Sequence, residues 1–203
     1  RRSQHPMWRV EAKLFRKLTG KCGKGVVIDV GCGSGDLLAA IGPEQGIGID
    51  GNGAAIEVAR SRHSEFEFRL GDAAELAVAD GSVDCIVAMH LIEHLSDPKP
   101  ALAEWRRAIK VGGRIVLTTP NQRFLHPEVF DDPDHKHIYT GPELTAVLTE
   151  AGFRAERAFA VGAWGVRRWP VLWRCQGLFR RLRWPRWWGQ SLCVSAVREG
   201  DSC

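Results

Sequence analysis

The chain has 203 residues, of which 44% are hydrophobic and 26% are charged, and its formal net charge at pH 7 is +4. We expect one soluble globular domain over residues 1–203, because the longest apolar runs, such as Val83–Ile92, are too short and too interrupted to span a bilayer. The six cysteines form no CxxC pair and the basic N-terminus has no unbroken apolar core. These features argue against a cysteine zinc site and a secretory signal, and they predict reduced thiols in a cytoplasmic protein.

Strand and helix patterns alternate along the chain. Apolar residues recur at helical spacing from Pro6 to Leu18 and predict a helix within residues 1–20. Strands are predicted at Val26–Val30, Gly46–Asp50, Phe66–Leu70, Val83–Met89, Arg114–Thr119, Phe153–Val161 and Leu192–Val197. Further helices are predicted at Asp36–Ile41, Ala54–Arg62, Pro98–Lys110, stopped by Val111-Gly112-Gly113, and Pro142–Ala151, capped by Thr140.

This alternation predicts an α/β fold with a doubly wound, Rossmann-like, mostly parallel sheet and helices on both faces. In such sheets, ligands bind beyond the carboxyl ends of the strands. Polar and small residues cluster directly after the predicted strands, at residues 29–35, Asp50, Asp72, residues 89–94 and residues 119–121. We therefore expect a ligand site along this edge.

The loop after the first strand reads Gly31-Cys32-Gly33-Ser34-Gly35 and is followed by Asp36. Its third glycine comes one residue too early for the GxGxxG of dinucleotide-binding loops, and an acid at a helix start would repel a pyrophosphate. A P-loop would need a Lys-Ser/Thr pair, which is absent. The loop suits a ligand with a cationic or zwitterionic end, because Asp29 and Asp36 can face an ammonium group while glycine backbone packs against it.

Five elements in chain order resemble the class I S-adenosylmethionine-dependent methyltransferases: VVIDVGCGSGD, GIGID, RLGDAAEL, DCIVAMHLIEHL and VGGRIVLTTPN. The resemblance covers roughly Lys24–Val161 and is nearest to small-molecule O-methyltransferases of the ubiquinone-pathway kind. It implies a seven-stranded sheet whose last strand, Leu192–Val197, is antiparallel. It also implies that S-adenosylmethionine is the methyl donor and S-adenosylhomocysteine the product.

The resemblance further implies which residues line the cofactor. Asp50 would take both ribose hydroxyls, since a carboxylate accepts two hydrogen bonds, and Asp72 would accept from the adenine amino group. The other cofactor-binding residues that it implies are Asp29, Gly31, Cys32, Gly33 and Gly35 around the methionine part, Gly51 and Ala73 beside the two acids, and Met89 and His90 beside the sulfonium.

A hydroxyl acceptor must also lose its proton, and histidine has a suitable pKa for this task. His90, His94 and His135 are therefore the expected catalytic residues. The stretch 89–92 lacks the (D/N)PP(Y/F) tetrapeptide of nucleic-acid amino-methyltransferases, which argues against N-methylation of bases.

MHLIEHLSD is similar to the ExxEH segment of ubiquinone-pathway O-methyltransferases and of small-RNA 2′-O-methyltransferases, a segment that can bind a divalent metal. Here His90 replaces the first Glu. We do not expect a metal, because Glu93 and His94 also occur in non-metal relatives. The set that could bind one would be His90, Glu93, His94 and His135.

Two segments are expected on the acceptor side. Residues 121–140 form a long polar loop containing DDPDHKHIYT, and long loops in compact domains often bind ligands. Residues 162–190 precede the last strand; between Trp164 and Trp188 lie seven arginines, six tryptophans and no acid, and without those arginines the net charge of +4 becomes −3. This segment suits an anionic membrane surface, packing on its own domain or, as the least favoured hypothesis, nucleic acid.

We therefore expect a cytoplasmic S-adenosylmethionine-dependent methyltransferase, with peripheral contact at the inner membrane face, acting at oxygen on a small-molecule or lipid-like acceptor. Two alternatives stay open. One is an RNA 2′-O-methyltransferase. The other is a methyltransferase-fold regulatory subunit that binds the cofactor without catalysis.

Overall fold

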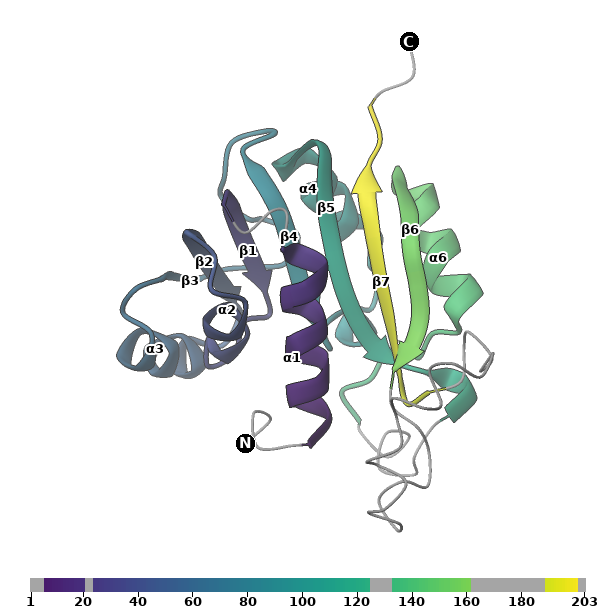
Figure 1. Ribbon diagram of the computed structural model, residues 1–203, viewed down its shortest axis with the longest axis horizontal. Helices are drawn as coiled ribbons and strands as arrows, with labels where there is room; N and C mark the ends of the chain where they lie inside the picture. Colours follow the sequence, from purple (N-terminus) through teal and green to yellow (C-terminus); the bar gives the residue numbers. More distant parts are fainter. Residues whose placement is uncertain (1–5, 21–23, 125–132, 162–188, 201–203) are drawn as a thin grey trace.

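The computed structural model describes residues 6–20, 24–124, 133–161 and 189–200 (Figure 1). Within these ranges, seven strands form one sheet in the order β3-β2-β1-β4-β5-β7-β6. The strands are β1 (Val26–Val30), β2 (Gln45–Asp50), β3 (Glu67–Leu70), β4 (Val83–Met89), β5 (Ile109–Pro120), β6 (Phe153–Val161) and β7 (Ser191–Arg198). The helices are α1 (Pro6–Thr19), α2 (Asp36–Ile41), α3 (Gly53–Arg62), α4 (Lys99–Ala108) and α6 (Gly141–Glu150), with short 3-10 turns η2 (Ile92–His94) and η3 (Gln122–Phe124).

The strand directions confirm the predicted sheet. β1 pairs in parallel with β2 and β4, β2 with β3, and β4 with β5. β7 runs antiparallel to both of its neighbours, β5 and β6. The doubly wound, mostly parallel arrangement brings the carboxyl ends of β1 to β5 to one edge of the sheet.

Helices cover both faces of the sheet. On one face, α1, α2 and α3 bury an apolar cluster that contains Phe15, Leu38 and Ile56. On the other face, α4 and α6 bury a second cluster around Trp105 and Leu144 (Figure 1). Burying one such large side chain contributes about 1.5–3 kcal/mol. The two clusters therefore stabilise the packing of the helices on the sheet that carries the carboxyl edge.

The prediction for the end of α4 was wrong. The helix stops at Ala108, and Ile109 already pairs with Val83 of β4. The next pair is Cys85 with Arg114, so the intervening residues form a bulge in β5 rather than a helix stop. Gly112, with φ 79°, supplies the left-handed backbone that the bulge needs.

The other predicted elements are present, and Thr140 caps α6 as expected. Its side chain accepts from Glu143 N while Glu143 accepts from Thr140 N, which is a capping box. No helix within the described part of the chain is long and apolar enough to cross a bilayer.

Candidate active site

Asp29 lies near the carboxyl end of β1 and is 1% exposed. Neither of its carboxylate oxygens has a hydrogen-bond partner among the described residues. Burial, and then the nearby charge of Asp50, raise the pKa of Asp29 well above its usual range. A buried carboxyl without partners is costly, so this position fits a cationic group of a ligand.

The glycine loop folds back over β2. Gly31 N and Cys32 N both donate to Ile49 O, at 2.8 and 3.1 Å. Gly35 has φ 77°, and a Cβ there would lie 2.7 Å from the Phe68 ring, so only glycine fits. Gly33 also has a positive φ, but a Cβ there would meet nothing within 4 Å, so open space lies beside its backbone.

Asp50 ends β2 and is held by backbone alone. Its Oδ2 accepts from Gly33 N and its Oδ1 from Asn52 N, each at 2.8 Å. Each carboxylate oxygen can accept a second hydrogen bond. The arrangement therefore orients Asp50 and leaves it able to bind two further donors, while Gly51 beside it is exposed.

Asp72 and Ala73 follow β3. Asp72 is exposed, and its Oδ1 accepts from Ala74 N at 2.7 Å. Ala73 is held by α4, because Trp105 Nε1 donates to its carbonyl oxygen at 2.9 Å. Leu70, at the end of β3, leaves 63% of its surface exposed, which suits a flat ring. The sequence analysis missed Leu70; its signal is an apolar residue directly before Gly-Asp.

Asp36 does not share the environment of Asp29. Its carboxylate lies 3.0 Å from Arg62 Nη2 and 3.2 Å from His63 Nε2, both at the end of α3, and it also accepts from Ser34 Oγ. Asp36 therefore connects α2 with α3. The expectation that it faces an ammonium group is not supported by these contacts.

His90, directly after β4, lies between two buried carboxylates. Its Nε2 is 3.1 Å from Glu11 Oε2, and its Nδ1 is 3.2 Å from Glu93 Oε1. Burial by itself would lower the pKa of His90, but the charges and hydrogen bonds of Glu11 and Glu93 raise it to about 10. A ring that donates from both nitrogens has no lone pair for a proton, so this geometry does not support His90 as a general base.

Glu11 was missed by the sequence analysis. It is 2% exposed on α1, and it falls in the helical stripe of Trp8, Phe15 and Leu18. An acid inside an apolar stripe is the signal that could have singled it out.

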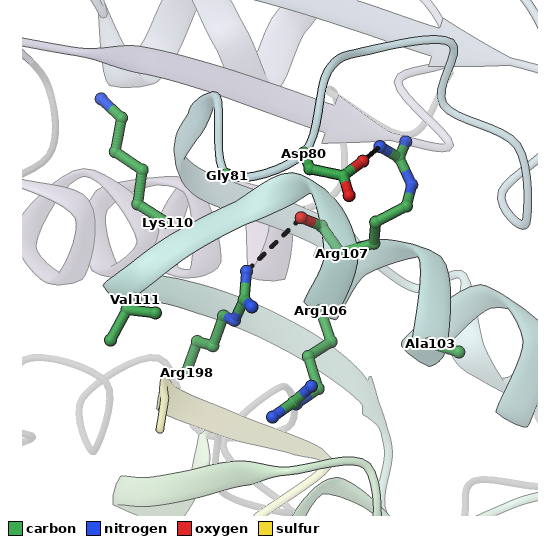
Figure 2. Close-up of a pocket in the computed structure, with 8 residues that line it drawn as sticks. All are labelled: Asp80, Gly81, Ala103, Arg106, Arg107, Lys110, Val111 and Arg198. Carbon is green, nitrogen blue, oxygen red and sulfur yellow. Dashed lines mark hydrogen bonds and ion pairs between the residues drawn. The ribbon is translucent and has the colours of Figure 1, made fainter. Parts of the chain in front are cut away.

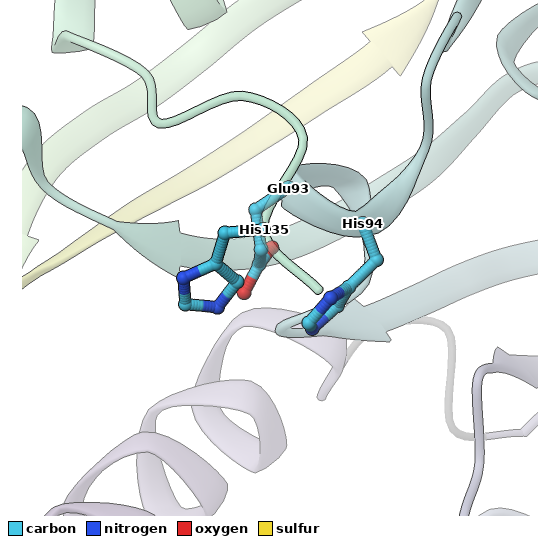
Figure 3. A group of neighbouring side chains, drawn as sticks. All are labelled: Glu93, His94 and His135. Atoms are coloured by element: carbon cyan, nitrogen blue, oxygen red, sulfur yellow. The ribbon is translucent and has the colours of Figure 1, made fainter. Parts of the chain in front are cut away.

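His94 and His135 come together with Glu93 (Figure 3). The potential ligand atoms of these three residues lie within 4.8 Å of one another, and His90 is not among them. Two imidazoles and a carboxylate suit a divalent cation. Both oxygens of Glu93, however, already accept hydrogen bonds, from His90 at 3.2 Å and from Thr119 at 3.0 Å.

The His94 ring has a defined tautomer in this arrangement. Its Nδ1 lies 3.1 Å from the carbonyl oxygen of Asp134, which can only accept. In the neutral ring, Nδ1 therefore carries the proton and Nε2 the lone pair. The His135 ring lies beside it, with ring centroids 4.9 Å apart.

The acceptor-side loop is described in part. Lys136 N and His137 N donate to Glu93 O at 2.8 and 3.1 Å, which fixes residues 133–140 against η2. Asn121, at the start of the loop, is buried and donates from Nδ2 to Gly189 O at 2.7 Å. Residues 125–132, and residues 162–188 with the whole Trp164–Trp188 stretch, lie outside the described residues.

A cavity of about 560 Å³ lies at the opposite edge of the sheet, by the amino ends of β4 and β5 (Figure 2). Its lining is basic, but Arg107 pairs with Glu104 and Asp80, and Lys110 with Asp84. Arg198 donates to the carbonyl oxygens of Arg107 and Ile109, at the end of α4. Cations at this point complement the helix dipole, so we interpret this cluster as structural.

Comparison with known proteins agrees with the fold and the motif order. A family described as a methyltransferase domain matches residues 28–117. A probable S-adenosylmethionine-dependent methyltransferase of Mycolicibacterium smegmatis is 33% identical over 153 residues, which are 73% of this chain and 59% of that protein. A ubiquinone biosynthesis O-methyltransferase of Alkalilimnicola ehrlichii is 36% identical over 104 residues, 47% of this chain and 42% of that one.

A solved S-adenosylmethionine-dependent methyltransferase from Archaeoglobus fulgidus superposes with a TM-score of 0.71 at 23% identity, covering 94% of each chain. The present chain spans just over half the length of its mycobacterial relatives, 59% and 53%. The family match runs from β1 into β5 and so includes the glycine loop and the acids after β2 and β3. The chain therefore belongs to the class I S-adenosylmethionine-dependent methyltransferase family.

Proposed function

We propose that this protein is an S-adenosylmethionine-dependent methyltransferase that acts at oxygen on a small-molecule or lipid-like acceptor. The observation that carries the proposal is the Asp29 carboxyl, buried and without a hydrogen-bond partner among the described residues. An ammonium group beside it would offset the cost of burying a charge. The cofactor of the family carries such a group on its methionine part.

The neighbouring strand ends supply the rest of the donor site in this proposal. Asp50 would hold the ribose hydroxyls with the lone pairs that Gly33 N and Asn52 N leave. Asp72 would accept from the adenine amino group, and Ala73 would donate its backbone N–H. The other residues of the proposed donor site are Gly31, Cys32, Gly33 and Gly35 through their backbone, Gly51, Met89 and His90.

When bound, the cofactor supplies a methyl group activated on a sulfonium, and transfer leaves S-adenosylhomocysteine. The chain's own contribution is to hold both reactants in line and to remove the acceptor proton. His94 is the proposed base, because its Nδ1–H is held by Asp134 O and its Nε2 can take a hydroxyl proton. His135, beside it, is the second candidate.

Two observations support an oxygen atom on a small or lipid-like acceptor. Relatives named O-methyltransferases include the ubiquinone biosynthesis enzyme and one from Penicillium expansum, 30% identical over 146 residues. The stretch between Val161 and Ser191 carries seven arginines and six tryptophans, and Ser191 itself pairs with both Val161 and Pro120. Such a basic, tryptophan-rich composition suits an anionic lipid surface.

Two measurements test the proposal. Calorimetry should detect binding of S-adenosylmethionine and S-adenosylhomocysteine; no binding at millimolar cofactor would overturn it. Transfer of a radiolabelled methyl group should then be seen to phenols in solution or to prenylated phenols in anionic vesicles, with or without chelator. Transfer only to the 2′-hydroxyl of a small RNA, or cofactor binding without transfer to any acceptor, would replace the proposal by one of the two alternatives.

A further inference from the structure

The N-terminal helix α1 places one carboxylate beside His90, at the carboxyl edge of the sheet. Glu11 is 2% exposed on the face of α1 that packs on the sheet beside α2 (Figure 1). A buried carboxylate without a partner would oppose the docking of this helix. Its partner is His90, 79 residues further along the chain.

The Glu11–His90 pair belongs to a chain of contacts across four elements. Both Glu11 oxygens lie within hydrogen-bond distance of His90 Nε2, at 3.1 and 3.2 Å. On the other side of the ring, His90 Nδ1 contacts Glu93, which also accepts from Thr119 Oγ1. Ser191, at the start of β7, donates to Glu11.

No other charged group among the described residues shapes the titration of this ring. Glu11 approaches it from α1 and Glu93 from η2, and these two acids are what raises its pKa. The uncharged thiol of Cys193, on β7, lies near Glu11, and burial raises the pKa of that thiol. Among the described residues, Glu11 and Glu93 are therefore the two acids that act on the ring, and a quarter of its side chain stays exposed.

The backbone of His90 has an unusual conformation. Its φ is 53°, a left-handed value that is sterically unfavourable for a residue with a Cβ. His90 N donates to Thr118 O at 2.9 Å, so the distorted residue is tied to β5 as well. Strained backbone of this kind persists only where surrounding contacts over-determine it, and it clusters at functional sites.

We propose that Glu11 is a positioning residue: by holding the His90 ring from the side opposite Glu93, it keeps the chain after β4 in its left-handed conformation and makes α1 part of the active site. This inference rests on the proposed function, because residues 89–90 are there assigned to the wall beside the methyl donor. It gives His90 the role of a fixed link between α1 and η2.

The test compares Glu11→Gln with His90→Gln, with the double variant and with Glu150→Gln, an exposed acid on α6 that serves as the matched control. Glu11→Gln keeps the shape of the side chain and removes its charge. Three readouts are taken: the ¹⁵N shifts of the histidine ring, amide hydrogen exchange at residues 89–91, and kcat separately from the KM for S-adenosylmethionine.

In the wild type we expect a doubly protonated His90 ring at pH 8 and slow exchange at His90 N. Glu11→Gln should lose the doubly protonated signature, speed exchange at residues 89–91 and lower kcat about 10-fold or more, since small misplacements of reacting groups are costly. The double variant should lose no more than either single variant, because the two residues act as a unit. Glu150→Gln should match the wild type in all three readouts.

A Glu11→Gln protein with unchanged exchange at residues 89–91 would overturn the inference. So would a double variant whose losses equal the product of the single losses. These outcomes are separate from failure of the proposed function. A protein that binds cofactor but transfers no methyl group would sink that proposal, while the ring shifts and the exchange data would still decide the inference.

Discussion

The two halves of the carboxyl edge differ in whether their acids form ion pairs. At the ends of β1, β2 and β3, none of the carboxylates of Asp29, Asp50 and Asp72 forms an ion pair among the described residues. Past β4, Glu11 and Glu93 are buried like Asp29, but they share the His90 ring. The difference teaches that buried charge alone does not mark a binding site. A carboxylate without an internal ion pair marks where a ligand completes the structure, and paired charge marks the support around it.

Removing Asp50 should weaken binding of the methyl donor more than any other change to the acids at the ends of β1, β2 and β3. Asp50→Ala deletes the proposed ribose ligand and the tie to Gly33 N, and hydrogen bonds to a charged group contribute about 1.5–3 kcal/mol each. We expect S-adenosylmethionine to bind about 1,000-fold more weakly, measured by calorimetry, with a melting curve to show that the variant folds. An affinity within threefold of the wild type would contradict the assignment.

Removing the proposed base should lower the rate of methyl transfer and leave cofactor binding unchanged. His94→Gln keeps a polar side chain but cannot take the acceptor proton, so kcat should fall about 100-fold while cofactor affinity stays unchanged. His135→Gln serves as the comparison, because its ring is adjacent. If His135→Gln loses more activity than His94→Gln, the two roles must be exchanged.

Asp29→Asn should have opposite effects on cofactor binding, which it weakens, and on the stability of the cofactor-free protein, which it raises at high pH. Cofactor affinity should fall about 10-fold, because the amide cannot neutralise an ammonium group. The raised pKa of Asp29 means that the folded, cofactor-free protein holds a proton that the unfolded chain releases above about pH 4. The stability that this proton provides is present below that pH and is lost as pH rises through the folded pKa.

The cofactor-free Asp29→Asn protein should therefore melt about 2–4 °C above the wild type at pH 8, a shift that corresponds to about 1 kcal/mol. The gap should close as the pH approaches 4. Thermal melts of both proteins at several pH values check this, and a wild type that is more stable than the variant at pH 8 would show that the Asp29 carboxylate is not in conflict with its surroundings.

The smallest effect is expected at the opposite edge, among the paired charges of the basic cavity. Asp80→Asn weakens an exposed ion pair with Arg107, which keeps Glu104 as a partner. Exposed pairs contribute about 1 kcal/mol or less, so melting should shift by no more than about 2–4 °C and cofactor affinity should not change. A clear loss of affinity would mean that the cavity in Figure 2 communicates with the donor site.

Much of the fold was predictable because its signals are local. Asp36–Ile41, Val83–Met89 and Phe153–Val161 have the predicted bounds at both ends, since each is an apolar pattern closed by a clear boundary. The bulge at Gly112 was not predictable, because a Gly-Gly pair at a helix end has the same composition as a Gly-Gly pair in a β-bulge.

The donor side of the site was also predictable, because topology brings every strand end to one edge. The partners of each acid were not. Asp36 and Asp29 lie seven residues apart and look alike in the sequence, yet one meets Arg62 and His63 across the loop and the other meets no described partner. Likewise, only the folded chain brings Glu11 to His90 and places the ring between two carboxylates.

The register at the carboxyl edge has a consequence for how such a protein can diversify. Ser191 pairs with Val161 on one side and Pro120 on the other, and Asn121 holds the carbonyls of Gly189 and Gln190. The sheet thus closes both ends of the stretch between β6 and β7 independently of what lies in it, and doubling the length of a flexible loop costs only about 0.6 kcal/mol. Homologues can therefore exchange stretches of different length and composition at this point, by recombination or by design, while the pairing of β5, β6 and β7 is inherited unchanged.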